Sequence, residues 1–441
     1  MTQKHNQRQR QQIVIVGAGF GGFQAAQSMA NADADVLLID RNNYSTFVPL
    51  LYQVATAQLE PSLVAYPIRT KLRGMRNIQF LQSQVELVDF DKQLVKTTAG
   101  PFAYDYLVLA TGTQSSYHSI PGAPEYTFPL KTLTDAIALR NHILRCFEKA
   151  SRMTDPHEQQ RLLTFLIVGG GATGVEVAGA LAELMRGALQ RDFIDLAGEG
   201  RLVLIQSGSG LLQEFSQRLG NYTHRHLEAM GIKVCLNTRI AQVEATRVIL
   251  ADGEAIATAT VIWAAGLEAT RPDLAPSLPP SPKRKLLVRD TLQLVDYANV
   301  YAIGDVAAFA QDHQSLSGVA PEALQQGVFV ARNLRRQLRN QPLQSFAYWN
   351  KGRLAIIGGY GGVGRILGIN FGGILAWALW LAVHVVYLPG YRSRLLVLLT
   401  WLQNYVLGDR ASRQILPAIA QLNIDKELSA LSVRSNPDDY L

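Results

Sequence analysis

Residues Ile13–Gly22 read IVIVGAGFGG. Four β-branched residues are followed by glycines in the spacing G-x-G-x-x-G, and an alanine-containing stretch comes next. This pattern predicts a strand, a tight turn and a helix. In such a turn Gly17 permits the sharp bend, Gly19 lets the backbone approach a pyrophosphate, and Gly22 lets the helix pack closely on the strand. The positive end of the helix dipole then faces the phosphates, so the segment predicts a dinucleotide site.

A second segment repeats the pattern. Phe165–Gly174 read FLIVGGGATG, with Gly169, Gly171 and Gly174 at the three glycine positions. Thr173 can donate a hydrogen bond to a phosphate. Because strand, glycines and helix recur in the same order, the chain is predicted to contain two dinucleotide sites.

The residue that ends the next strand differs between the two sites. Asp40 ends the strand-like VLLID and lies 21 residues beyond Gly19, where an acid would accept hydrogen bonds from a ribose. The second site has Gln206 at this position, at the end of RLVLIQ. A neutral amide can bond a ribose hydroxyl but does not repel a 2′-phosphate, so NADPH is expected as a donor beside NADH. The alternative is that Gln206 is a surface residue at a strand end.

Strand-like runs alternate with helical stretches up to about Trp349, which predicts an α/β fold with parallel sheets. Turn-rich segments near Pro121 and at Arg271–Lys283 are interpreted as domain crossings. Beyond Trp349 the sequence becomes glycine-rich and then strongly apolar. We predict two Rossmann-like domains and a C-terminal helical region. The first domain comprises 1–125 and 290–345, the second 126–289, and the C-terminal region 346–441.

Composition excludes several classes of protein. The formal charge of +7 favours an anionic partner, but the arginines accompany no nucleic-acid recognition motif, so nucleic acid is not expected. Only two cysteines occur, Cys146 and Cys235, too far apart for a C-x-x-C pair and too few for a four-cysteine cluster. No metal site is predicted. The polar start MTQKHNQRQRQQ contains no apolar signal segment, so the protein is expected on the cytoplasmic side.

Further motifs indicate a family. With both glycine loops, ATG at Ala110–Gly112, AAG at Ala264–Gly266 and YAIGDVA at Tyr301–Ala307, the chain resembles the two-dinucleotide-binding-domain flavoproteins. Within this group it is most similar to the type II NADH:quinone oxidoreductases, also called alternative NADH dehydrogenases. That similarity lies in FVPLLYQVAT at Phe47–Thr56, GVEVAGAL at Gly174–Leu181, APEALQQG at Ala320–Gly327 and the apolar Leu375–Trp401.

The resemblance implies FAD in the first site, with Asp40 on its ribose and Asp305 near its ribityl or phosphate region. It implies NADH or NADPH in the second site, with the nicotinamide stacked on the flavin for hydride transfer. The alternative for Asp305 is a loop cap after its strand. Other positions expected at the cofactors are Phe20, Gly21, Arg41, Pro49, Leu50, Thr111, Gly112, Ala265 and Gly266.

Three side chains are candidates for the chemistry. Glu176 is expected in the first turn of the second binding helix, near the nicotinamide and flavin, where a carboxylate could orient the ring or assist proton movement. Its alternative role is that of a carboxylate at the positive end of the helix dipole. Gln325 and Gln326 fall in the family's quinone-side motif, although Pro321 stands where the family commonly has another glutamine. Their alternative is polarity on a helix surface.

The apolar stretch Phe371–Pro389 is about as long as a bilayer-spanning helix and contains one ionisable residue, His384. Glycines at its start and Pro389–Gly390 at its end favour a broken hairpin that lies in the membrane interface. A spanning helix and a buried core helix are the alternatives. Several aromatic residues would suit the headgroup level: Trp377, Trp380, Tyr387, Tyr391 and Trp401. Four arginines share one helical face by their spacing: Arg332, Arg335, Arg336 and Arg339. This stripe is expected either to meet anionic lipid or to be a solvated face.

Together these features predict an enzyme that oxidises NADH or NADPH through FAD and gives two electrons to a membrane quinone, without proton pumping. It is expected to bind the bilayer surface as a peripheral, monotopic protein on the cytoplasmic face, with a homodimer as a possible assembly. The alternatives are a flavoprotein reductase of a soluble redox acceptor and a non-catalytic NAD(P)H-binding sensor.

Overall fold

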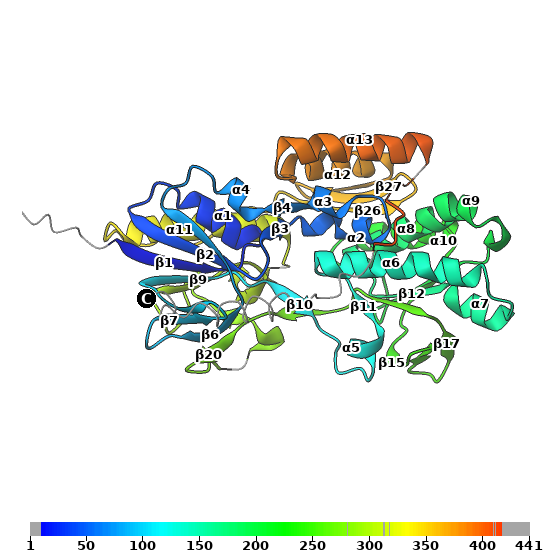
Figure 1. The fold of residues 1–441 in the computed structure, drawn as a ribbon, viewed down its shortest axis with the longest axis horizontal. Helices are drawn as coiled ribbons and strands as arrows, with labels where there is room; N and C mark the ends of the chain where they lie inside the picture. Colours follow the sequence, from blue (N-terminus) through cyan, green and yellow to red (C-terminus); the bar gives the residue numbers. More distant parts are fainter. Residues whose placement is uncertain are drawn as a thin grey trace, which may run out of the picture.

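The computed structural model describes residues 10–279, 281–311, 314–316, 318–408, 410 and 412–416. Two parallel sheets lie at the two ends of the molecule, and a C-terminal layer covers the junction between them (Figure 1). The α/β class predicted from the alternating strand and helix patterns is confirmed.

The first sheet contains the first glycine loop. Its strand order is β22–β9–β1–β2–β5, and all neighbours are parallel. The chain returns to this sheet late, because β22 comes from beyond residue 290, and α1 and α11 pack together on it. The elements are β1 (Gln11–Val16), β2 (Ala34–Asp40), β5 (Ile78–Gln82), β9 (Tyr106–Leu109), β22 (Val300–Ala302), α1 (Phe20–Ser28) and α11 (Ala320–Gln337).

The second sheet repeats the arrangement around the second glycine loop. Its order is β11–β18–β12–β13–β14, again entirely parallel. Its elements are β11 (Phe128–Pro129), β12 (Thr164–Val168), β13 (Arg201–Ile205), β14 (Ile232–Cys235), β18 (Thr260–Trp263), α6 (Leu133–Ala150), α8 (Ala172–Leu184) and α10 (Gln217–Ala229).

Two crossings join the halves. β10 (Thr113–Ser115) and β19 (Leu267–Ala269) pair antiparallel where the chain leaves and re-enters the first half. β20 (Asp273–Ala275) then pairs with β6 (Val85–Asp89), so part of the range predicted for the second domain adds to a sheet of the first. The exact domain boundaries stay a prediction. That sheet is completed by β7 (Leu94–Thr97) and β8 (Gly100–Ala103), and a small sheet near the second half contains β15 (Ile240–Val243), β16 (Arg247–Leu250) and β17 (Ala255–Ala257).

Shorter elements fill the connections. They are β3 (Tyr44–Thr46), η1 (Val48–Leu50), α2 (Leu51–Ala55), α3 (Pro61–Val64), β4 (Ala65–Pro67), α4 (Ile68–Lys71), α5 (Ala123–Tyr126), α7 (Pro156–Leu162), η2 (Met185–Leu189), α9 (Gln190–Asp192), η3 (Ile194–Leu196), η4 (Pro282–Arg284), β21 (Leu286–Leu287), η5 (Gly304–Val306), β23 (Ala307–Ala308), β24 (Ala310–Gln311) and β25 (Gln314–Ser315).

The C-terminal layer consists of a three-stranded antiparallel sheet and a helical hairpin, with β26 (Arg353–Gly358), β27 (Gly361–Ile366), β28 (Ile369–Gly372), α12 (Ile374–Tyr387) and α13 (Tyr391–Leu407). The breaks predicted at Gly373 and at Pro389–Gly390 are confirmed. One face of the hairpin is buried, since Trp380 and Trp401 belong to the largest hydrophobic core. Among the described residues, no helix combines the length and apolar character needed to cross a membrane.

Candidate active site

The first glycine loop has the geometry that a pyrophosphate requires. Gly17 has a φ of 100°, and a β-carbon there would overlap the carbonyl oxygen of Ala110. A β-carbon on Gly22 would overlap the Gly17 carbonyl oxygen, whereas one on Gly19 would meet nothing within 4 Å. The loop is therefore tightly packed at its base and open at Gly19. Helix α1 starts at this open point with no side-chain cap and no acid in its first turn, so its backbone N–H groups can bind an anion.

Asp40 holds this loop in place. It is the last residue of β2, and its carboxylate accepts hydrogen bonds from the Ala18 N–H at 2.7 Å and the Asn42 N–H at 2.8 Å. Burial raises the pKa of Asp40, although both hydrogen bonds favour the charged form. The carboxylate lies beside the loop as the sequence predicts, while its contact with a ribose stays a prediction. Arg41, the next residue, is exposed.

A second group of polar residues gathers around Asp305. Its carboxylate accepts from the Thr113 hydroxyl at 3.0 Å and pairs with the Lys131 ammonium at 3.5 Å. The Gln326 amide oxygen accepts from the Gly304 N–H at 2.5 Å, and Asp305 and Gln326 line the same small cavity. Lys131 was missed by sequence reasoning because it lies 174 residues from Asp305 with no motif around it.

The second glycine loop repeats the geometry of the first. A β-carbon on Gly169, whose φ is 113°, would lie 2.7 Å from the Ala264 carbonyl oxygen, and Gly174 abuts the Gly169 carbonyl. Gly171 again faces open space, and α8 begins after it without a side-chain cap. The Gln206 amide oxygen accepts from the Gly170 N–H at 2.9 Å, so Gln206 lies against the loop. This contact supports a role for Gln206 at the nucleotide over an isolated surface position.

Glu176 lies one turn further along than predicted. Helix α8 begins at Ala172 and has no acid in its first turn, so the expectation of a first-turn carboxylate is wrong. The Glu176 carboxyl lies beside Ile356 and Trp380, both in the C-terminal layer, and both neighbours favour its charged form. Burial raises the pKa of Glu176 to about 8, which keeps a proton on this carboxyl near neutral pH.

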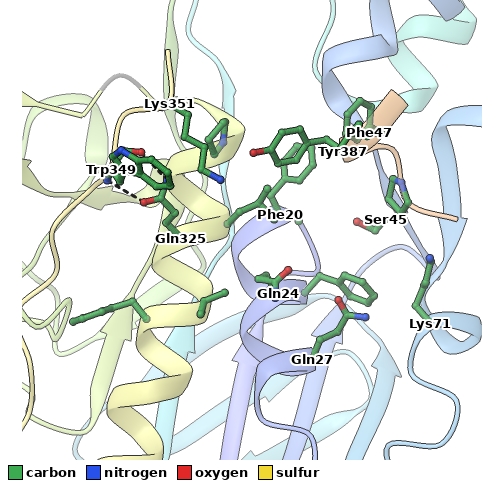
Figure 2. Close-up of a pocket in the computed structure, with 18 of the residues that line it drawn as sticks. Phe20, Gln24, Gln27, Ser45, Phe47, Lys71, Gln325, Trp349, Lys351 and Tyr387 are labelled. Atoms are coloured by element: carbon green, nitrogen blue, oxygen red, sulfur yellow. Dashed lines mark hydrogen bonds between the residues drawn. The ribbon is translucent and has the colours of Figure 1, made fainter. Parts of the chain in front are cut away.

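A cavity of about 870 Å³ lies between α1, α11 and the end of α12 (Figure 2). Gly19 and Phe20 of the first glycine loop line it, and so do Tyr387 and Pro389 of the hairpin. Its lining is largely apolar and includes three cations but no acid. These cations are Lys71, Arg332 and Lys351. The cavity therefore joins the first dinucleotide loop to the apolar hairpin.

The two glutamines of the quinone-side motif point to different places. Gln325 lines the cavity, and its amide makes two 3.0 Å hydrogen bonds with the backbone of Trp349 (Figure 2). Gln326 is buried and faces Gly304, outside the lining of the large cavity. Trp349 and Tyr387 were not predicted as parts of this site, because elements distant in the sequence bring them there.

Two of the remaining predicted positions lie against the loops, since Thr111 lies beside Gly17 and Ala265 beside Gly169. Thr111 donates to the Thr270 carbonyl and Gly112 accepts from the Thr270 N–H, so both stabilise the crossing between the halves. A β-carbon on Gly266 would overlap the ring of His118. Leu50 is fully buried in the core, and Pro49 is half-buried beside it in η1.

The arginine stripe predicted on α11 does not form a free lipid-facing surface. Arg335 donates to the carbonyls of Ser28 and Ala30, and Arg336 donates to the Pro342 carbonyl. Only Arg332 and Arg339 remain well exposed. Half of the stripe therefore stabilises the fold.

Both cysteines are free thiols. Cys146 is buried and Cys235 is half-buried, and burial raises the pKa of each thiol. A raised pKa suppresses the reactive thiolate.

Two glycine loops on two parallel sheets, joined by paired crossing strands, define a protein with two dinucleotide-binding units. The family model described as pyridine nucleotide-disulphide oxidoreductase matches residues 11–327. The chain is also 32% identical over 453 residues to the type II NADH:quinone oxidoreductase Ndh of Mycobacterium tuberculosis, with 96% of each chain covered. The protein therefore belongs to the pyridine nucleotide-disulphide oxidoreductase family and, within it, to the type II NADH:quinone oxidoreductases.

Other similarities agree with this assignment. The type II NADH:quinone oxidoreductase of Staphylococcus aureus is 28% identical over 370 residues, covering 81% of this chain and 90% of that protein. A solved structure of NDH2 from Plasmodium falciparum in complex with NADH matches with a TM-score of 0.84 at 21% identity. It covers 92% of this chain and 100% of that one, which shows the shared fold.

Proposed function

We propose that the protein oxidises NADH through a bound FAD and passes two electrons to a quinone. When bound, FAD accepts a hydride from the nicotinamide and delivers two electrons to an acceptor. Both loops fit dinucleotides, because each is open at its second glycine and offers an uncapped helix N-terminus. The names of the related proteins support the same reaction.

Within this proposal the protein chiefly positions its ligands. Gly19 and the start of α1 would hold the pyrophosphate of FAD, with Asp40 beside the ribose and Asp305 near the ribityl chain. Gly171, Thr173 and Gln206 would hold the NADH. Glu176 would hold a proton at its carboxyl beside Trp380, which suits a reaction that consumes protons at the quinone.

The cavity carries the proposal for the acceptor. It runs from the flavin-side loop at Gly19 to the hairpin at Tyr387, so an apolar molecule from the membrane would reach the flavin through it. Gln325 and Phe20 would lie along this path. Because Gln326 accepts from the Gly304 N–H and lines the small cavity with Asp305, it would lie on the flavin side of the path.

The hairpin would attach the protein to the bilayer surface. The outer side of α12 and α13 exposes several apolar residues, among them Ile374, Leu375, Val386, Leu395, Leu399, Leu402 and Val406. Such a surface is typical of helices that lie in the membrane interface. The cytoplasmic face and the homodimer stay predictions.

The test compares two acceptors while the cavity is narrowed. Val328 lines the cavity and is 39% exposed, whereas Val295 is 45% exposed and lies outside it. Val328→Trp should lower turnover of NADH with a lipophilic quinone severalfold and leave ferricyanide reduction near the normal rate. Val295→Trp should change neither. Equal loss with both acceptors, or undiminished quinone turnover in Val328→Trp, would contradict the cavity as the quinone path. A soluble protein acceptor that outperforms every quinone would favour the reductase alternative.

A further inference from the structure

Four basic side chains lie close together in sequence at and beyond helix α4. They are Arg69, Lys71, Arg73 and Arg76, in the segment IRTKLRGMR at Ile68–Arg76, which contains no acid. Arg69, Arg73 and Arg76 are exposed and Lys71 is half-buried. We call these four residues the basic rim.

The basic rim has no acidic partner in the described part of the chain. Ten salt bridges occur among the described residues, and none involves a residue of the rim. Arg69 packs over the ring of Phe80, 5.0 Å from its centroid, which leaves its positive charge uncompensated. The rim is therefore an uncompensated concentration of positive charge.

Lys71 of the basic rim lies next to the apolar hairpin. The Lys71 ammonium approaches the turn between α12 and α13, where a β-carbon on Gly390 would lie 3.7 Å from it. Tyr66, just before α4, lies beside Ser393 at the start of α13. Figure 1 shows α4 near the edge of the molecule on which α12 and α13 lie.

The same place is the hairpin end of the cavity. Lys71 and Pro389 both line the cavity. On the hairpin side Tyr391 is 87% exposed and Arg392 is exposed beside it. Apolar side chains, cations and the cavity thus meet at one edge of the protein.

We propose that the basic rim, together with Arg392, binds the phosphate groups of anionic lipids while the hairpin enters the interface. The proposal rests on the proposed function, because it places the cavity against the membrane that holds the quinone. An interfacial apolar surface binds lipid more firmly when a basic cluster adds electrostatic attraction to it. Both an anionic lipid surface and an acidic protein would complement the charge of the rim. Only the lipid surface would also cover the exposed apolar hairpin beside the rim, which an acidic protein partner would leave in water.

The test removes three charges from the rim without touching the cavity lining. The variant carries Arg69→Gln, Arg73→Gln and Arg76→Gln, and the control carries Lys96→Gln, Lys233→Gln and Arg239→Gln. The control residues are exposed cations on β7, on β14 and before β15, so both variants lose the same net charge. Binding of each holoenzyme to vesicles of phosphatidylcholine alone, or of equal parts phosphatidylcholine and phosphatidylglycerol, is measured by sedimentation at low and high salt.

The rim variant should bind the anionic vesicles at least about tenfold more weakly than the unaltered protein at low salt. High salt should remove most of that difference. The control should bind within about twofold of the unaltered protein, and binding to phosphatidylcholine should be the same for all three. An equal loss in the control, no loss in the rim variant, or capture by an acidic protein without any preference for anionic vesicles would overturn the proposal.

Flavin reduction and turnover with a short-chain quinone in detergent keep this test separate from the proposed function. Both should be unchanged in the rim variant. If the unaltered protein fails to reduce quinone yet binds anionic vesicles through the rim, the proposed function fails and the lipid site stands.

Discussion

The buried Arg410 pairs with the partly exposed Glu183, with 2.8 Å between Nη2 of Arg410 and Oε2 of Glu183. The guanidinium also donates to the carbonyls of Thr56 and Ala180, both at 2.9 Å. The second carboxylate oxygen accepts from the Gly359 N–H at 2.7 Å. The pair therefore connects α8, the end of α2, the turn after β26 and the segment that follows the hairpin.

Breaking this pair should destabilise the protein strongly. Glu183→Ala would leave the buried Arg410 without a counter-charge, which costs about 3–5 kcal/mol. Glu158→Ala is the control, because the carboxylate in its ion pair with Arg161 is more exposed and exposed ion pairs contribute little to stability. Thermal unfolding should show a much larger loss for Glu183→Ala. Equal melting temperatures for the two variants would mean that Arg410 does not anchor the C-terminal layer.

The raised pKa of Glu176 predicts a pH-dependent stability. A carboxyl with a folded-state pKa of about 8 and an ordinary unfolded-state pKa near 4.5 holds a proton in the folded state that the unfolded state releases. Stability is therefore lost as pH rises from about 4.5 to about 8, and the loss is complete above that range. Glu176→Gln removes this titration and keeps a side chain of the same shape beside Ile356 and Trp380. The difference in melting temperature between this variant and the unaltered protein should shift in favour of the variant as pH rises. If the two melting temperatures change with pH in the same way, the pKa of Glu176 is not raised in the folded protein.

Gln206 should set the choice between NADH and NADPH. Its amide lies against the Gly170 N–H, so Gln206→Glu would put a carboxylate next to the second glycine loop. Repulsion of a 2′-phosphate at an intermediate dielectric constant is worth roughly 2–4 kcal/mol. We expect measurable NADPH use by the unaltered protein, and a much larger fall in kcat/KM for NADPH than for NADH after substitution. Gln242→Glu, on exposed β15, is the control. If the ratio of kcat/KM for NADPH to kcat/KM for NADH is unchanged by the substitution, Gln206 does not face the adenosine ribose.

The exposed face of α13 should govern membrane attachment. Leu395, Leu399, Leu402 and Val406 share one face by their spacing, and replacing all four with Gln should cost roughly 3–6 kcal/mol of membrane binding. Ferricyanide reduction by NADH should be preserved while turnover with a lipophilic quinone falls. Four exposed apolar residues elsewhere serve as the matched control: Ile194, Leu267, Leu287 and Val295. Membrane binding that survives the α13 changes would place the anchor elsewhere.

Removing the whole region beyond Ser345 would be a poorer test. Ile357, Trp380, Val397 and Trp401 belong to the main core, so truncation would expose that core as well as the hairpin. The sequence correctly predicted a helical hairpin broken at Pro389–Gly390, and its place in the membrane interface stays a prediction. The sequence could not show that the inner face of the hairpin completes the core.

Local patterns were enough to predict the two glycine loops and their sheets. Gly22 must lack a side chain because it packs on the Gly17 carbonyl, and Gly174 because it packs on the Gly169 carbonyl. Both contacts lie within the strand–turn–helix motif. The contacts of Gly17 with Ala110 and of Gly169 with Ala264 reach a later strand end and are not contained in the motif. The position of Glu176 was misjudged by one turn, because the start of α8 depends on where the glycine loop ends.

Long-range contacts could not be predicted in the same way. The Lys131–Asp305 pair, the Trp349–Gln325 bonds and the Arg410–Glu183 pair each join segments that no motif connects. Arg335 shows how a local pattern can mislead. Its spacing indicates a charged surface, but in the folded chain its guanidinium donates to the carbonyls of Ser28 and Ala30.

The central claim is that hydride from NADH reaches a quinone through flavin in this protein, and stopped-flow absorbance of the purified holoenzyme tests it most directly. Mixing with NADH in the absence of oxygen should bleach the flavin absorbance within the turnover time. A second mixing with a quinone should restore that absorbance at a rate no slower than steady-state turnover. Flavin that stays oxidised with NADH, or reduced flavin that ferricyanide reoxidises but quinones do not, would contradict the account.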